Sequence, residues 1–201
     1  EVQALKQGRW QTTIGVGLAG ATLGIYAYGR IGSQMAHIGR AFGMNVVCWG
    51  REKSMAAARA AGFVSAASRE EFFASADILS LHLPLNRETA GIVRPSDLAR
   101  MKPDSLLVNT SRAGIIEPGA LVAGPRLGRP GRAAVDVFEE EPVVAGDHPL
   151  LKLHSALCTP HLGYVERSNY EAMFAVAVDQ IVAFVDGQPM NVVNPEVSLE
   201  R

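Results

Sequence analysis

The chain has 201 residues, of which 48% are hydrophobic, and its net charge is −1. It can therefore bury a sizeable core, and its near-neutral charge argues against a nucleic-acid or acidic-membrane surface. No apolar run reaches membrane-spanning length, and the first residues are charged and polar, so a soluble cytoplasmic protein is expected. The two cysteines, Cys48 and Cys158, lie in apolar runs without metal-ligand spacing, which predicts buried reduced thiols and no metal site.

The segment 22–52 predicts a continuous βαβ unit. Residues 22–26 and 45–49 are mostly β-branched or apolar, as in buried strands, and a helix is predicted between them from about Arg30 to Gly43. Four apolar residues recur there at helical spacing, namely Ile31, Met35, Ile38 and Phe42. Met35 is assigned to the core. The first turn of such a helix directs unpaired amides and the positive end of the helix dipole at a bound pyrophosphate.

The turn before this helix resembles the G-x-G-x-x-G dinucleotide fingerprint. It runs from Ala27 to Gly32, with Ala27 in place of the first glycine. Gly29 would let the backbone approach the phosphates, and Gly32 would let helix and strand pack closely. The literal pattern occurs at 15–20, but no strand precedes it and no helix follows, so it is not interpreted as the site.

The remaining chain alternates predicted helices and strands. Further strands are expected at 77–82, 105–109, 133–138 and 156–159. Helices are expected at 1–10, 52–61, 95–100 and 168–186, and a further helix is expected to begin at the capping box of 68–71. A helix should also open at 117–118, but Gly124-Pro125 and Pro130-Gly131 should shorten it. The alternation predicts an α/β fold, a Rossmann-type doubly wound parallel sheet with helices on both faces.

Three polar residues that follow predicted strands suit the reduction of a carbonyl next to a carboxylate, because ligands of such sheets bind beyond the carboxyl ends of the strands. Arg112 could pair bidentately with the substrate carboxylate. His161 could exchange the proton, and a glutamate could keep that imidazole charged. Spacing alone does not choose among the glutamates of 139–141. The other histidines are interpreted as structural: His37, His82, His148 and His154.

The motifs GRIG, HLPLNRETAGIV, VNTSRAGII, VDVFEEEP and TPHLGY occur in this order. Together they resemble the NAD(P)-dependent D-2-hydroxyacid dehydrogenases, the family of phosphoglycerate dehydrogenase and of the glyoxylate and hydroxypyruvate reductases, over nearly the whole chain. The resemblance implies hydride transfer between NAD or NADP and C2 of a small 2-oxo or 2-hydroxy acid, with Arg112, Glu141 and His161 as the catalytic trio. It implies cofactor contacts at Gly29, Arg30, Ile31, Gly32, Gly50, Arg51, Leu83, Pro84, Thr89, Thr110, Ser111, Asp136 and Gly163, with Asp136 at the nicotinamide carboxamide.

The resemblance also implies a domain organisation. Residues 1–20 would form an interdomain helix and connection, 21–187 the dinucleotide-binding domain, and 188–201 a tail returning toward an absent N-terminal substrate domain. A homodimer through the cofactor-binding domain is implied. The alternative is a dinucleotide-sensing module without turnover.

The end of the second strand predicts cofactor preference. An acidic residue there would bind the ribose hydroxyls and repel a 2′-phosphate, but this place holds Gly50 and Arg51. NADPH is therefore expected to be accepted at least as well as NADH, with Glu52 as the argument against.

Overall fold

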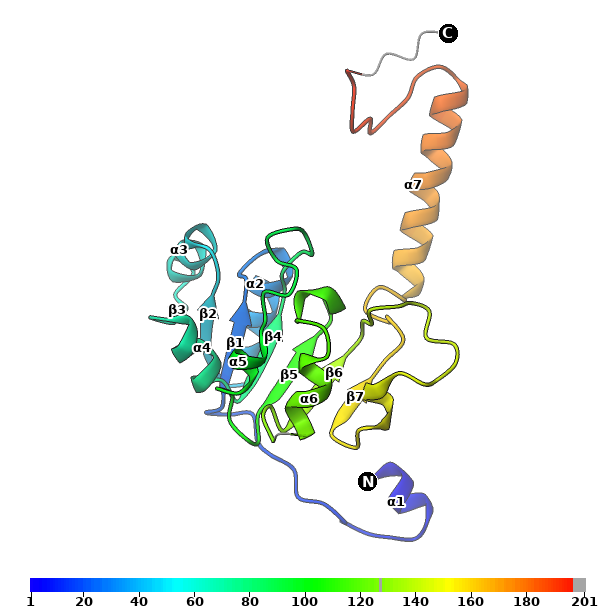
Figure 1. Ribbon diagram of the computed structural model, residues 1–201. Coiled ribbons are helices and arrows are strands. Elements are labelled where there is room, and N and C mark those ends of the chain that lie inside the picture. Colours follow the sequence, from blue (N-terminus) through cyan, green and yellow to red (C-terminus); the bar gives the residue numbers. More distant parts are fainter. Residues whose placement is uncertain (127, 197–201) are drawn as a thin grey trace. The chain divides into compact units, whose positions relative to one another are not determined.

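One parallel sheet of seven strands organises the first part of the chain (Figure 1). The computed structural model describes residues 1–126 and 128–196. The strands are β1 (Thr22–Tyr26), β2 (Asn45–Trp49), β3 (Val64–Ser65), β4 (Ile78–Leu81), β5 (Leu106–Asn109), β6 (Arg132–Val135) and β7 (Ala156–Cys158). Their order is β3-β2-β1-β4-β5-β6-β7, and every neighbouring pair is parallel. The predicted doubly wound α/β fold is confirmed.

Helices cover both faces of this sheet. In chain order the covering helices are α2 (Arg30–Ala41), α3 (Glu52–Ala60), α4 (Arg69–Ser75), α5 (Pro95–Leu98) and α6 (Ala120–Arg126), with 3-10 turns at Ala113–Ile115 and Pro149–Lys152. In the described part of the chain, the first helix, α1 (Val2–Lys6), contributes no residue to the two cores of the sheet. One core joins α2 and α3 to strand residues such as Ile25 and Cys48. The other joins α4, α5 and α6 to residues such as Tyr26 and Leu79. Adjacent strand residues such as Ile25 and Tyr26 serve opposite cores because side chains alternate across a strand.

Helix α2 buries a different face from the one its apolar residues indicate. The buried positions are Gly32, Ala36 and Gly39, whereas Ile31, Ile38 and Phe42 are exposed and Met35 is only half-buried. A Cβ on Gly39 would lie 2.5 Å from Leu23 Cδ2, so the helix packs too closely on β1 for a larger residue. The spacing predicted the helix correctly. Met35, which was assigned to the core, is half-buried and packs against the core of residues such as Ile25 and Cys48, while small residues form the fully buried positions of the helix.

Several predicted boundaries change. The first helix covers only Val2–Lys6, and the helix expected at Pro118 begins at Ala120. Strand β3 was not predicted, since its two residues give no periodic signal. Cys48 is buried as expected, whereas Cys158 is half-buried, and burial raises the pKa of the Cys48 thiol to about 11. The predicted cap at Ser68 is confirmed, because its side chain accepts from the Glu71 amide at 3.1 Å.

Chain contacts divide the molecule into a first unit, Glu1–Pro160, and a second unit that begins at His161. The second unit is built on α7 (Arg167–Val185), close to the helix predicted at 168–186. None of the α7 residues is buried, so the assignment of Phe174 to a core was wrong. Over the described ranges, no helix has the length and apolarity needed to cross a membrane. The predicted tail 188–201 lies partly outside the described residues.

Candidate dinucleotide-binding site

The carboxyl ends of the strands gather the polar segments of the first unit at one edge of the sheet, because all the strands are parallel. Ala27 follows β1, Gly50 follows β2, Thr110 follows β5 and Asp136 follows β6. These four residues therefore lie at the end of the sheet where the sequence predicted a ligand site.

The turn between β1 and α2 has the shape of a phosphate-binding loop. Ala27 takes a left-handed conformation, with φ +76°. A Cβ on Gly32 would lie 2.2 Å from the carbonyl oxygen of Ala27. Gly32 must therefore remain a glycine. A Cβ on Gly29 would meet no atom within 4 Å, so the space above this residue is open.

Helix α2 directs its first amides toward that open space. Its first backbone hydrogen bond runs from the Ser33 amide to the Gly29 carbonyl, at 2.9 Å. The amides of Arg30, Ile31 and Gly32 precede that bond, and they carry the positive end of the helix dipole. The loop and the helix thus fit a pyrophosphate, as the sequence predicted.

A cleft of about 420 Å³ adjoins this turn and fits the adenosine half of a dinucleotide. Five residues predicted to contact the cofactor lie in its lining, namely Gly50, Arg51, Leu83, Pro84 and Thr89, and their contact with the cofactor stays a prediction. The sequence did not indicate the others, which are Tyr26, Ala27, Trp49, Ser54, Asn86, Glu88 and Ile92. Asn86 and Glu88 belong to the same HLPLNRET motif as Pro84 and Thr89, so the motif was the available signal for them.

Ser54 ties the two glycine-containing turns together at this cleft. Its Oγ accepts a hydrogen bond from the Tyr28 amide at 2.7 Å. A Cβ on Gly50 would lie 3.1 Å from that oxygen and 3.5 Å from Ala27 Cα. A side chain at Gly50 would therefore press on Ser54, which favours glycine where the end of β2 approaches the β1 turn.

Thr89 and Ser111 use their hydroxyl groups inside the protein. Thr89 Oγ1 donates to the Pro84 carbonyl at 2.6 Å, and Ser111 Oγ donates to the Leu83 carbonyl at 2.7 Å. Both bonds position the segment that follows β4. Thr110 and Ser111 lie outside the lining of the cleft, so their contact with the cofactor stays a prediction.

Arg112 is exposed just beyond β5. Its Nη1 donates to the Ser111 carbonyl at 2.6 Å, while its own carbonyl accepts from Asn109 Nδ2 at 3.0 Å. The buried Asn109 thus holds the backbone of this turn and leaves the guanidinium near solvent.

Glutamates of the acidic loop 139–141 have different hydrogen-bond partners. Glu141 Oε1 accepts from the Phe138 amide at 2.8 Å, and Glu139 Oε2 lies 3.0 Å from His148 Nε2. Glu139 is therefore engaged with His148. Asp136 is buried, and its Oδ1 accepts from the Thr159 hydroxyl.

His161 and Gly163 belong to the second unit. His161 has a left-handed backbone, with φ +53°, and its ring meets Tyr164 edge to face at a centroid distance of 5.4 Å. The catalytic roles of Arg112, Glu141 and His161, and the cofactor contact of Gly163, stay predictions.

His82, just after β4, shows how burial affects a titratable group beside the site. Burial lowers its pKa to about 4, and its Nε2 has no hydrogen-bond partner among the described residues. The ring is thus neutral near pH 7, consistent with a structural role.

Comparisons with known proteins agree with this geometry. The family described as "D-isomer specific 2-hydroxyacid dehydrogenase, NAD binding domain" matches residues 2–163. A glyoxylate reductase of Aeropyrum pernix is 42% identical over 185 residues, which are 92% of this chain and 55% of that protein. The crystal structure of a putative D-3-phosphoglycerate dehydrogenase from Ralstonia solanacearum superposes with a TM-score of 0.91 at 48% identity, over 96% of this chain and 60% of that one.

A probable 2-hydroxyacid dehydrogenase from Rhizobium etli, solved in complex with NADP, HEPES and L(+)-tartaric acid, is 27% identical with a TM-score of 0.70, over 94% of this chain and 60% of that one. The chain thus spans little more than half the length of these relatives. The family match covers most of the chain and includes the strands, the turn and the cleft described above. The chain therefore belongs to the D-isomer specific 2-hydroxyacid dehydrogenase family and carries its NAD-binding domain.

Proposed function

We propose that the protein is an oxidoreductase that moves a hydride between NAD(P)(H) and C2 of a small 2-hydroxy or 2-oxo acid. The observation that carries this proposal is the open turn at the head of α2 beside a 420 Å³ cleft, in a chain of this family. Relatives named as glyoxylate reductase and D-3-phosphoglycerate dehydrogenase support the substrate class.

The residues divide the work as follows. The nicotinamide, when bound, gives or accepts the hydride. Arg112 pairs with the substrate carboxylate. Its guanidinium donates an exposed hydrogen bond to the Ser111 carbonyl, which it can exchange for a bond to the acid. His161 holds the proton that the carbonyl oxygen gains, and Glu141 favours the charged imidazole.

The test combines binding with turnover. Titration calorimetry of the 201-residue chain should show NADH binding, because the turn and the cleft lie within it. In the full-length natural protein, His161→Ala should lower kcat for glyoxylate or hydroxypyruvate reduction by about 10²–10⁴-fold, the usual effect of removing a positioned acid/base, with little change in NADH affinity.

His154→Ala is the matched control, since His154 is exposed and was interpreted as structural. If His161→Ala keeps full activity, the catalytic assignment is wrong. NADH binding without turnover in the full-length protein would instead favour the dinucleotide-sensing module.

NADP is proposed as a second accepted cofactor. Arg51 lines the cleft at the end of β2, where a 2′-phosphate would lie, and the Rhizobium relative was solved with NADP. Arg51→Ala should weaken NADPH binding selectively in calorimetric titrations. An equal loss for NADH would contradict the role of Arg51.

We also propose a homodimer in the cytoplasm. The exposed apolar residues of α7 support the dimer, and the free thiols of Cys48 and Cys158 support a reducing compartment.

A further inference from the structure

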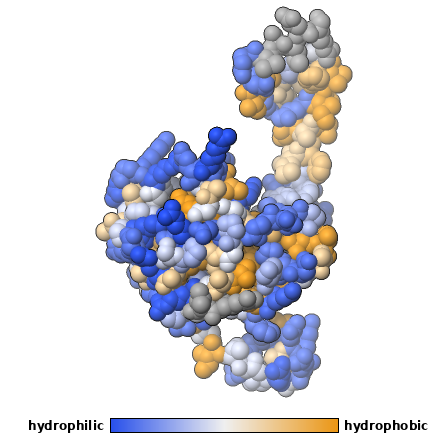
Figure 2. Space-filling model, in the orientation of Figure 1, coloured by the Kyte–Doolittle hydropathy of each residue, from blue (hydrophilic) through white to orange (hydrophobic). Residues whose placement is uncertain are grey.

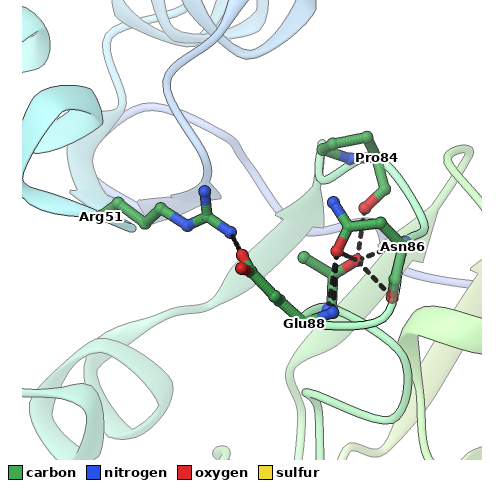
Figure 3. Close-up of polar contacts among 5 residues, drawn as sticks. Arg51, Pro84, Asn86 and Glu88 are labelled. Atoms are coloured by element: carbon green, nitrogen blue, oxygen red, sulfur yellow. Dashed lines mark hydrogen bonds and ion pairs between the residues drawn. The ribbon is translucent and has the colours of Figure 1, made fainter.

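Arg51 and Glu88 meet at the cleft although their positions in the sequence are 37 apart. Arg51 comes from the end of β2 and Glu88 from the segment after β4, and Arg51 Nη2 donates to Glu88 Oε2 (Figure 3). We propose that Glu88 is a specificity-determining residue that lowers the affinity for a 2′-phosphorylated dinucleotide. This inference rests on the proposed NAD(P) function and adds a determinant outside the second strand.

A turn with internal hydrogen bonds holds the backbone at Glu88. The Glu88 amide donates to Asn86 Oδ1 at 2.9 Å, and the Asn86 amide donates to Thr89 Oγ1 at 2.8 Å. That hydroxyl donates in turn to the Pro84 carbonyl at 2.6 Å, and Thr89 is 4% exposed. Figure 3 shows these bonds on the loop side of the contact. The carboxylate is therefore presented at the cleft by a loop with internal hydrogen bonds.

The charges explain how this carboxylate would discriminate. Among the described residues that line the cleft, Arg51 carries the positive charge and Glu88 carries the negative charge. A 2′-phosphate needs the Arg51 guanidinium, so Glu88 competes with it for the same donors and repels it as a like charge. The ribose hydroxyls of NADH carry no charge, and a carboxylate can accept hydrogen bonds from them.

The contact is also open enough to exchange partners. The side chains of Arg51 and Glu88 are 72% and 73% exposed, and ion pairs this exposed are weak and sensitive to salt. A phosphate can therefore displace Glu88 from Arg51, so Glu88 reduces NADPH binding without preventing it.

The test is the variant Glu88→Gln in the 201-residue chain, which removes the charge and keeps the shape. The affinities of NADPH, NADH, adenosine 2′,5′-bisphosphate and 5′-AMP are measured by calorimetric titration for the variant and for the wild-type chain. The two 2′-phosphorylated ligands should bind the variant about 3- to 10-fold more tightly than they bind the wild type. The other two should change less than about twofold. The gain should shrink in about 0.5 M salt.

Glu52→Gln is the matched control. Glu52 is the residue next to Arg51, but it pairs with Arg59 and lies outside the cleft lining. It should leave the NADPH to NADH ratio unchanged. The gain from Glu88→Gln should become smaller when Arg51→Ala is added, because only the like-charge repulsion of the phosphate then remains.

Three outcomes overturn the inference. They are an unchanged ratio in Glu88→Gln, equal gains for all four ligands, and an equal gain in Glu52→Gln, which would indicate only long-range charge. Each of these leaves the proposed function intact if NADH still binds. Failure of the wild-type chain to bind any of the four ligands would overturn the proposed function, and this inference with it.

Discussion

Ala27 occupies the position where the dinucleotide fingerprint has its first glycine, and its backbone shows why a glycine suits it. Its φ of +76° lies in the left-handed region, where an L-residue with a Cβ is strained by roughly 1–2 kcal/mol. The strain persists because β1 and α2 hold both ends of the turn. The Ala27 amide donates to the Trp49 carbonyl at 2.8 Å, which ties the turn to β2.

Ala27→Gly should therefore stabilise the protein by about 0.5–1 kcal/mol, since the relieved strain exceeds the extra chain entropy of glycine. Urea unfolding measures the change, and dinucleotide affinity should rise or stay equal. Ala57→Gly is the control. This exposed residue lies within α3, where glycine should cost about 1 kcal/mol. If both variants lose stability alike, the turn has adapted to alanine.

His82 makes the stability depend on pH. An unfolded histidine titrates near 6.5, whereas burial lowers the folded pKa to about 4. Between these values the unfolded chain binds more protons, so the free energy of unfolding should fall as pH falls from about 6.5 toward 4.

His82→Leu should flatten that part of the pH profile in urea unfolding measured between about pH 7 and pH 5. The slope is the readout, since the absolute stability of the variant can differ for packing reasons. The exposed His154→Leu should leave the slope unchanged. An unaltered slope in His82→Leu would show that other groups cause the pH dependence.

At the scale of the elements, an ion pair joins α4, α5 and β1 beneath the cleft. Arg69 Nε and Nη2 each donate to an Asp97 carboxylate oxygen at 2.8 Å, and Arg69 Nη1 donates to Tyr26 Oη at 2.9 Å. Burial raises the pKa of Asp97, but the hydrogen bonds from Arg69 and from the Arg94 amide outweigh it, so the pKa lies below its ordinary value.

Asp97→Ala should cost about 3–5 kcal/mol in urea unfolding, because it leaves the half-buried Arg69 guanidinium without its carboxylate. Glu52→Ala breaks an exposed pair with Arg59 and should cost less than about 1 kcal/mol. Similar losses in the two variants would mean that burial adds nothing to the Arg69–Asp97 pair.

The elements also show which sequence signals were reliable. Strands β1, β2, β4 and β5 and the start of α2 were predicted closely, because each rests on a run of apolar residues or on glycine chemistry at a turn. Strand β3 gave no such signal. The fully buried positions of α2 carry no large apolar residue, because close packing on β1 selects small residues there.

At the scale of the molecule, α7 carries an apolar stripe. Phe174, Val178, Ile181 and Val185 recur at helical spacing, and all four are exposed, Phe174 by 63%. Apolar surface is visible on the α7 part of the chain in Figure 2. A second copy of the chain would remove this surface from water.

Replacing Phe174 and Ile181 together by serine should convert the expected dimer to a monomer in size-exclusion chromatography with light scattering. Glu171→Gln, also exposed on α7, should leave the dimer intact. A wild-type chain that is monomeric at about 100 μM would contradict this role of α7, since interfaces of standard size bind far more tightly.

The sequence by itself determined the alternation of strands and helices, the parallel sheet and the glycine-containing turn before α2, because each depends on residues close together in the chain. The family resemblance of its motifs predicted cofactor contacts at Gly50, Arg51, Leu83, Pro84 and Thr89, and these residues line the cleft. Only the tertiary structure decided that Glu88 reaches Arg51 and that Ser54 joins two turns. Such contacts depend on which strands become neighbours, and β1 lies between β2 and β4 although it precedes both in the chain.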